Sequence, residues 1–122
     1  MLDAGALIAI DRRDRRVLAL LRTLEQRRVP VLTSSAAVAR VWRDGKKQAN
    51  LARTLAGIDV RALAPSDDRR TGELLGAAHA NDVVDGHVAL LATEGDDVLT
   101  SDPADLRRLL AARGVDARIV TC

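Results

Sequence analysis

The sequence predicts an α/β domain in which a mostly parallel sheet lies between two layers of helices. Short apolar runs alternate with longer segments whose apolar residues recur at helical spacing. No repeat or linker-like stretch interrupts the 122 residues, a length that suits one domain. Strands that alternate with helices form parallel sheets covered on both faces, so we expect a single three-layer α/β/α domain over residues 1–122.

The predicted strands are short runs rich in leucine or β-branched residues. They lie at residues 2–10, 29–32, 58–63, 97–100 and 117–120. Between these runs, apolar residues spaced three and four apart predict helices. The helical patterns lie around residues 17–24, 38–42, 51–55, 74–78, 83–91 and 106–110.

Capping residues mark several of the expected helix ends. Ser34 or Ser35 can cap the helix that leads to the only tryptophan, and Ser66 opens the helix through residue 75. Asp102, followed by a proline, can cap the last helix, and Gly114 can end it. These signals agree with the boundaries that the apolar pattern indicates.

The composition excludes several classes of protein. Trp42 is the only aromatic residue, so the chain cannot stack bases as sheet- and barrel-type nucleic-acid binders do. Its single cysteine, Cys122, excludes an internal disulfide and suits a reducing compartment. One cysteine and two histidines are too few for a structural zinc site of the usual kind.

Charge is divided unequally along the chain. Residues 1–53 hold 12 Lys and Arg against 5 Asp and Glu, whereas residues 54–122 hold 7 against 12. A basic half can follow a phosphate backbone and an acidic half can hold cations. The commoner explanation of any one charged run is a solvated helix face. No signal peptide and no membrane-length apolar run is found, so we expect a soluble, cytoplasmic protein with no membrane partner.

Four aspartates lie where a strand should end or a helix should begin. They are Asp3, Asp82, Asp85 and Asp102. Because the carboxyl ends of parallel strands meet at one edge of the sheet, their carboxylates could converge there on Mg²⁺ or Mn²⁺. Each also has a structural explanation, since three can cap helices and Asp85 can favour the positive end of a helix dipole.

The ordered set of motifs resembles a PIN domain, in particular the VapC-type ribonuclease toxins of bacterial toxin–antitoxin pairs. The motifs are LDAGALI at 2–8, VWR at 41–43, DVVDGHV at 82–88 and TSDP at 100–103. The resemblance implies a PIN-like three-layer fold, an Mg²⁺ or Mn²⁺ site, RNA cleavage, a homodimer and a VapB-like antitoxin. Matched by motif, the resemblance implies that Asp3, Asp85 and Asp102 are catalytic metal ligands and that Asp82 is a further ligand.

The chain departs from this family at two places. Arg40 stands where the family usually has a glutamate, and Asp44, four residues on, could pair with it or partly replace the missing acid. Only Met1 and Leu2 precede Asp3, so the first strand is either short or incomplete in this sequence.

The sequence therefore predicts a metal-dependent endoribonuclease whose basic residues engage RNA phosphates. The proposed phosphate contacts are Arg12, Arg13, Arg43 and Lys46. One alternative is a catalytically impaired PIN-like protein that binds RNA or a partner, with Arg40 at the usual acidic position. A phosphoryl-transfer or signalling domain ranks lower, because Gly5 stands where one such class needs a second acid. His79 and His87 are expected to be surface or partner contacts.

Overall fold

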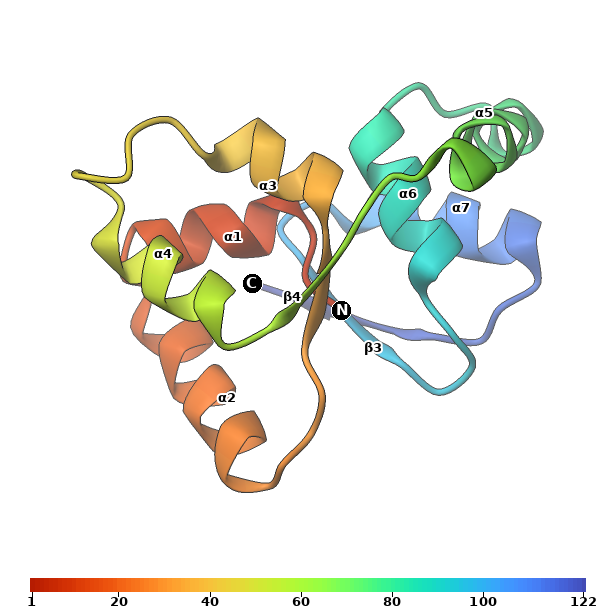
Figure 1. Ribbon diagram of the computed structural model, residues 1–122. Helices are drawn as coiled ribbons and strands as arrows, with labels where there is room; N and C mark the ends of the chain where they lie inside the picture. The colour runs from red at the N-terminus through yellow and green to blue at the C-terminus, as the bar shows by residue number, and fades with distance from the viewer.

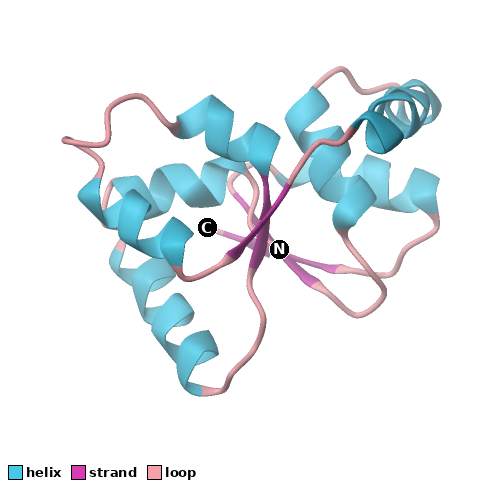
Figure 2. Ribbon diagram, viewed as in Figure 1, coloured by secondary structure: helices cyan, strands magenta, loops and turns pink.

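The computed structural model describes all 122 residues and shows seven helices and four short strands (Figures 1 and 2). The helices are α1 (Ala4–Asp11), α2 (Arg15–Gln26), α3 (Ser35–Val41), α4 (Ala49–Ala56), α5 (Pro65–Ala78), α6 (Val83–Leu91) and α7 (Pro103–Arg113). The strands are β1 (Leu32–Ser34), β2 (Asp59–Arg61), β3 (Asp97–Thr100) and β4 (Arg118–Thr121).

The strands form two parallel pairs that a single residue joins. β1 pairs with β2 and β3 pairs with β4. Between the pairs, Leu2 makes parallel bridges to Thr33 of β1 and to Leu99 of β3. The spatial order is therefore β2, β1, the Leu2 segment, β3 and β4. Where the sequence predicts the first strand, the structure shows only these bridges of Leu2.

The predicted strand over residues 2–10 is wrong beyond Leu2. Asp3 has extended backbone angles, and its Oδ1 accepts a hydrogen bond from the Ala6 amide at 2.8 Å, which starts α1. Residues Ala6, Leu7 and Ile10 are fully buried. A run that is apolar on every side fits a buried strand or a buried helix equally well, so the pattern alone could not separate them.

Helices lie on both sides of the strands, as the α/β class requires. Successive strand residues face opposite layers: Leu99 packs in a cluster with α1 and α4, whereas Val98 packs with α5, α6 and α7. In the same way, Leu2 belongs to the first cluster and Met1 packs against the second. In Figure 1, α1, α2 and α4 lie on one side of the strands and α5, α6 and α7 on the other.

Most other predicted boundaries hold within three residues, with two differences. α3 ends at Val41, so Trp42 lies just outside it, and α5 begins at Pro65 without a side-chain cap rather than at Ser66. Gly114 ends α7 in the left-handed conformation, with φ of 73°, as expected. None of the helices has both the length and the apolar character needed to cross a bilayer.

Candidate functional site

The predicted aspartates lie at the carboxyl ends of the central strands and at the start of α6. Asp3 directly follows the Leu2 segment, Asp102 follows β3 after one residue, and Asp82 and Asp85 occupy the first turn of α6. The sequence places these acids in three separate segments. In the fold the charge of Asp102 acts on Asp3, and the charges of Asp82 and Asp3 act on Asp85. The details differ for each residue.

Asp85 shows the strongest electrostatic effect. Burial and then the negative charges of Asp82, Asp3 and Asp105 raise the pKa of Asp85 to about 7, while Arg40 lowers it in part. Like charges raise a carboxyl pKa because ionisation adds to the repulsion. The neighbouring cations therefore do not compensate this group of acids fully.

Asp3 is 4% exposed and combines a structural role with an electrostatic one. Burial raises the pKa of Asp3, and the charge of Asp102 raises it further. Hydrogen bonds from the Thr100 hydroxyl and from the amides of Ala6 and Gly5 lower this pKa. The net pKa lies above its usual value. Asp3 caps α1 through Oδ1, which leaves the capping and metal-binding explanations compatible.

Asp82 has its oxygens engaged by hydrogen bonds. Oδ1 caps α6 by accepting from the amides of Val84 at 2.9 Å and Asp85 at 3.2 Å. Arg40 donates from Nη1 to Oδ2 at 2.7 Å and from Nη2 to Oδ1 at 3.2 Å. Burial raises the pKa of Asp82, but the hydrogen bond from Arg40 and those of the helix amides outweigh burial, so the net pKa is lowered.

The pairing of Arg40 with Asp44, one of the possibilities that the sequence left open, does not form. α3 ends at Val41, so Asp44 lies beyond the helix and does not share its face. Arg40 instead reaches from α3 to Asp82 at the start of α6. Arg40 is thus bonded to one of the four predicted ligands.

Asp102 is exposed and lies beside a close contact between two segments. It occupies the cap position of α7 without a side-chain capping bond, and its amide donates to Thr100 Oγ1 at 3.0 Å. A Cβ atom on Gly5 would lie 2.0 Å from Ser101 Oγ. Glycine at position 5 therefore lets the segment that carries Asp102 lie directly on the start of α1, next to Asp3.

The four aspartates have the kind of oxygen ligand that a hard divalent cation prefers, but their side chains are not grouped around one point. Aspartate oxygens are preferred ligands of Mg²⁺ and Mn²⁺. Burial and then the neighbouring carboxylates raise the pKa of Asp85, and a cation would reduce the repulsion from those carboxylates. No three Asp, Glu, His or Cys side chains, however, are grouped closely enough to hold an ion as they lie.

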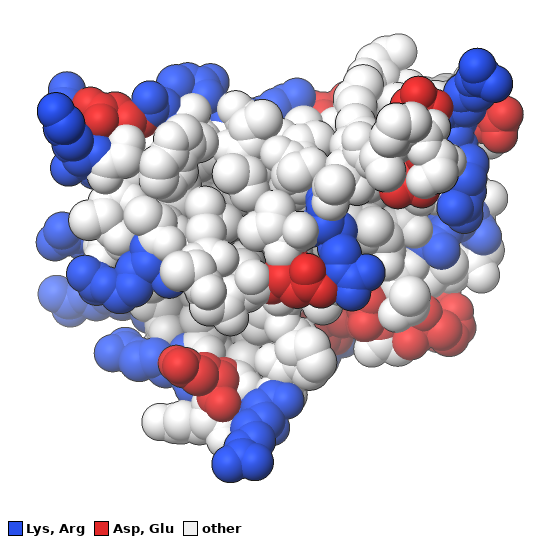
Figure 3. Space-filling model, viewed as in Figure 1, with Lys and Arg blue, Asp and Glu red and all other residues white.

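The predicted phosphate contacts are exposed basic side chains. They lie on the part of the molecule that contains α1 to α4, away from the helices α5, α6 and α7. Arg12, Arg13, Arg43 and Lys46 are exposed and form no ion pair. Lys and Arg surround the part of the surface over α1 to α4 in Figure 3, whereas Asp and Glu gather near the start of β3. This distribution matches the charge division along the sequence.

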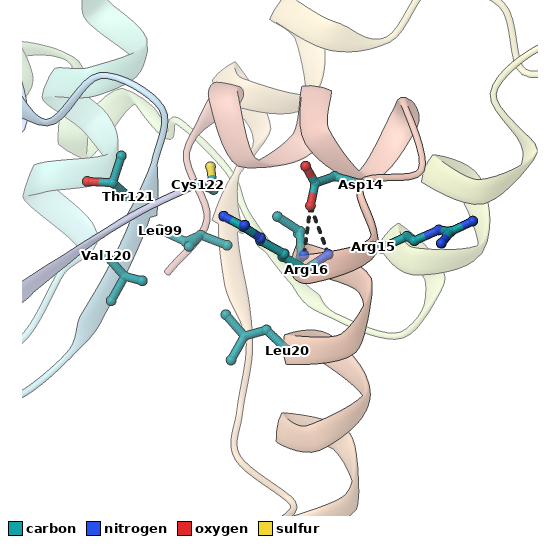
Figure 4. A pocket seen from close by; sticks show the side chains of 9 residues that line it. Asp14, Arg15, Arg16, Leu20, Leu99, Val120, Thr121 and Cys122 are labelled. Atoms are coloured by element: carbon teal, nitrogen blue, oxygen red, sulfur yellow. Dashed lines mark hydrogen bonds between the residues drawn. The ribbon is translucent and has the colours of Figure 1, made fainter.

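Two adjacent grooves lie beside the basic residues of α1 and α2. The first, of about 450 Å³, lies between α2 and β4, where Arg16 extends toward Cys122 and Arg15 points away (Figure 4). The second shares Asp14 and Cys122 with the first, and it is also lined by Arg12, Gly5 and Ser101. Arg12 thus lines the same groove as the Gly5–Ser101 contact beside Asp3.

Sequence reasoning missed the environment of His87. It is fully buried rather than a surface contact, and its Nδ1 lies 2.6 Å from Ser34 Oγ. Burial lowers the pKa of His87, although nearby Asp67 raises it in part. His87 falls on the apolar stripe of α6 with Val84 and Val88, and this spacing was the available signal. His79, by contrast, is exposed at the end of α5.

Comparison of the chain with family models, curated proteins and solved structures finds no match. The similarity to PIN domains accordingly rests on the sequence motifs and on the chemistry of the residues described above.

Proposed function

We propose that this protein is a metal-dependent endoribonuclease with a PIN-like fold, similar to VapC toxins. The observation that carries the proposal is the placement of Asp3, directly after the Leu2 segment, near Asp85 in the first turn of α6. In support, burial and then carboxylates that include Asp3 raise the pKa of Asp85 to about 7. Carboxyl groups with strongly raised pKa values concentrate at functional sites. Their position at the carboxyl ends of parallel strands is where α/β proteins commonly bind ligands.

In this proposal Asp3, Asp85 and Asp102 supply oxygens to Mg²⁺ or Mn²⁺. When bound, the ion makes a water molecule nucleophilic near neutral pH and offsets charge on the leaving oxygen of the phosphodiester. Asp85 must lose its proton to donate an oxygen, so loading is favoured above its pKa of about 7. An ion bound by Asp82 would compete with Arg40, whose two hydrogen bonds engage both carboxylate oxygens.

The substrate and partners follow from charge and from the resemblance. Arg12, Arg13, Arg43 and Lys46 are exposed and without ion-pair partners, and the proposal assigns them to RNA phosphates. A homodimer, a VapB-like antitoxin and a cytoplasmic location belong to the same proposal.

A second candidate function is a catalytically impaired PIN-like protein that binds RNA or a partner. The observation that favours it is the bidentate bond between Arg40 and Asp82, which places a fixed cation among the acids. Such a cation supplies part of the charge relief that a metal ion would otherwise provide.

Cleavage of total RNA with Mn²⁺, and with Mn²⁺ plus EDTA, tests both candidates. The wild type is compared with Asp85→Asn and with Asp59→Asn, a matched change at an exposed carboxylate of β2. The nuclease proposal expects cleavage that EDTA and Asp85→Asn abolish and Asp59→Asn retains. RNA binding without cleavage supports the second candidate. The absence of both RNA binding and cleavage contradicts the nuclease proposal and the RNA-binding form of the second candidate.

A further inference from the structure

Three consecutive hydroxyl side chains at the junction of β1 and α3 make three different long-range contacts. Thr33 Oγ1 donates to the carbonyl oxygen of Leu2 at 2.8 Å, and Ser34 Oγ bonds His87 Nδ1 at 2.6 Å. Ser35 Oγ accepts from the amide of Leu63 at 3.0 Å. The first two contacts are fully buried at β1, whereas the third is only partly buried.

The two buried contacts end beside the two buried or half-buried acids. Leu2 directly precedes Asp3, and His87 lies two residues after Asp85 on α6. β1 contributes no acid, yet its adjacent hydroxyls bond the two segments that carry Asp3 and Asp85. Buried hydrogen bonds of this kind restrict geometry strongly, because breaking one leaves a polar group without water.

The direction of the bond between Ser34 and His87 depends on which nitrogen of the neutral imidazole carries the hydrogen. Ser34 Oγ already accepts the Ala36 amide at 3.0 Å as the cap of α3, which leaves its hydrogen able to donate to Nδ1. The imidazole then carries its hydrogen on Nε2, which lies 3.8 Å from Asp67 Oδ2 of α5. Ser34 is thus bonded to α3 and α6 at once.

We propose that Thr33 and Ser34 are positioning residues that set the separation of Asp3 and Asp85. Thr33 holds the segment before Asp3 against β1. Ser34 holds α6 at a fixed position relative to the same strand through its bond to His87. This inference rests on the proposed function, because the separation of the acids matters only if they bind one cation. It assigns a role to residues that make no contact with the ion or with RNA themselves.

The test compares Mn²⁺ affinity by calorimetry in Thr33→Val, Ser34→Ala and Ser35→Ala. Valine keeps the shape and strand preference of Thr33 but removes the donor to Leu2. Ser35→Ala is the matched control, since it also removes one of the three hydroxyls. The partner of this hydroxyl, Leu63, is far in sequence from the four candidate aspartates. Groups that orient metal ligands typically contribute about 10- to 100-fold to affinity. We expect losses of that size in Thr33→Val and Ser34→Ala and less than about twofold in Ser35→Ala.

Substitutions of His87 separate positioning from general stability. Asparagine can place an acceptor near the position of Nδ1, whereas leucine cannot. We expect His87→Asn to retain more Mn²⁺ affinity than His87→Leu, with thermal unfolding curves recorded for both. In RNA cleavage, kcat falls in Thr33→Val while KM stays near wild type, because the phosphate contacts are unchanged.

The results distinguish the inference from the function on which it rests. Wild-type Mn²⁺ affinity in both Thr33→Val and Ser34→Ala overturns the positioning role and leaves the nuclease proposal intact. A wild-type protein that binds no Mn²⁺ overturns the nuclease proposal, and the positioning role with it. If Ser34→Ala fails to fold because α3 loses its cap, Thr33→Val and the two His87 variants still decide the question.

Discussion

Arg40 of α3 bonds both carboxylate oxygens of Asp82 at the start of α6, at 2.7 and 3.2 Å. The side chains are 48% and 28% exposed. Pairs this exposed typically stabilise a protein by only about 0–1 kcal/mol. The pair therefore matters more for the charge of the acidic cluster than for the stability of the fold.

Replacing Arg40 by Glu is expected to strengthen Mn²⁺ binding. The substitution removes the cation that partly neutralises Asp82 and Asp85, and it adds a carboxylate beside them. Isothermal titration of Mn²⁺ into both proteins measures the effect. Arg53→Glu is the control, because it makes the same charge change at an exposed position of α4 that forms no ion pair.

Equal Mn²⁺ affinity in wild type and Arg40→Glu would mean that Arg40 does not compete with the ion. An equal gain in Arg40→Glu and Arg53→Glu would attribute the effect to net charge rather than to the bond with Asp82. Either result contradicts the prediction.

Asp85→Asn is expected to abolish metal-dependent cleavage and to weaken Mn²⁺ binding without unfolding the protein. The amide has nearly the shape of the carboxylate, so no cavity forms, but the charged oxygen is lost. Circular dichroism checks the fold, and cleavage with Mn²⁺ checks the activity. Wild-type turnover in this variant would exclude Asp85 as a ligand.

The stability of the protein is expected to fall as the pH rises through the range in which Asp85 titrates. Its pKa is about 7 in the folded protein and near 3.8 when unperturbed, so between these values the folded state holds a proton that the unfolded state has lost. The free energy of unfolding then decreases with rising pH. Asp85→Asn lacks this contribution, so its unfolding free energy should decrease less between pH 4.5 and 8.

Urea unfolding of both proteins at several pH values measures this difference. A wild-type curve parallel to that of Asp85→Asn would show that the pKa of Asp85 is not raised. Mn²⁺ affinity should rise with pH over the same range, since the ion competes with the proton on Asp85.

Local patterns predicted most elements because capping residues and apolar spacing are short-range signals. β3 was predicted at residues 97–100 and lies there, and Gly114 ends α7 as expected. The exception is α1, since a short run that is apolar on all sides has no amphipathic pattern to separate helix from strand.

Contacts between distant segments could not be predicted in the same way. The sequence supplied the four aspartates as candidates, but not the bond between Arg40 and Asp82, which spans 42 positions. The buried bond of Ser34 to His87 spans 53 positions, and each residue alone has a common local explanation. Such pairs depend on how helices pack, which neither composition nor spacing encodes directly.

The contact of Gly5 with Ser101 leads to the last prediction, a pair of Gly→Ala substitutions with opposite effects. Alanine is preferred over glycine in helices by roughly 1 kcal/mol, so propensity alone favours both Gly5→Ala in α1 and Gly72→Ala in α5. At Gly72 no neighbouring atom lies within 4 Å of the added Cβ, and we expect stabilisation of about 0.5–1 kcal/mol.

At Gly5 the Cβ would lie 2.0 Å from Ser101 Oγ, 2.9 Å from its Cβ and 3.0 Å from its backbone nitrogen. Rotation of the Ser101 side chain cannot relieve the last two contacts, so the segment that carries Asp102 must move, at a cost of about 1–3 kcal/mol. Urea unfolding should therefore show Gly5→Ala below wild type and Gly72→Ala above it, with Mn²⁺ affinity reduced only in Gly5→Ala. A stabilised Gly5→Ala with unchanged Mn²⁺ affinity would show that this contact does not hold Asp102 beside Asp3.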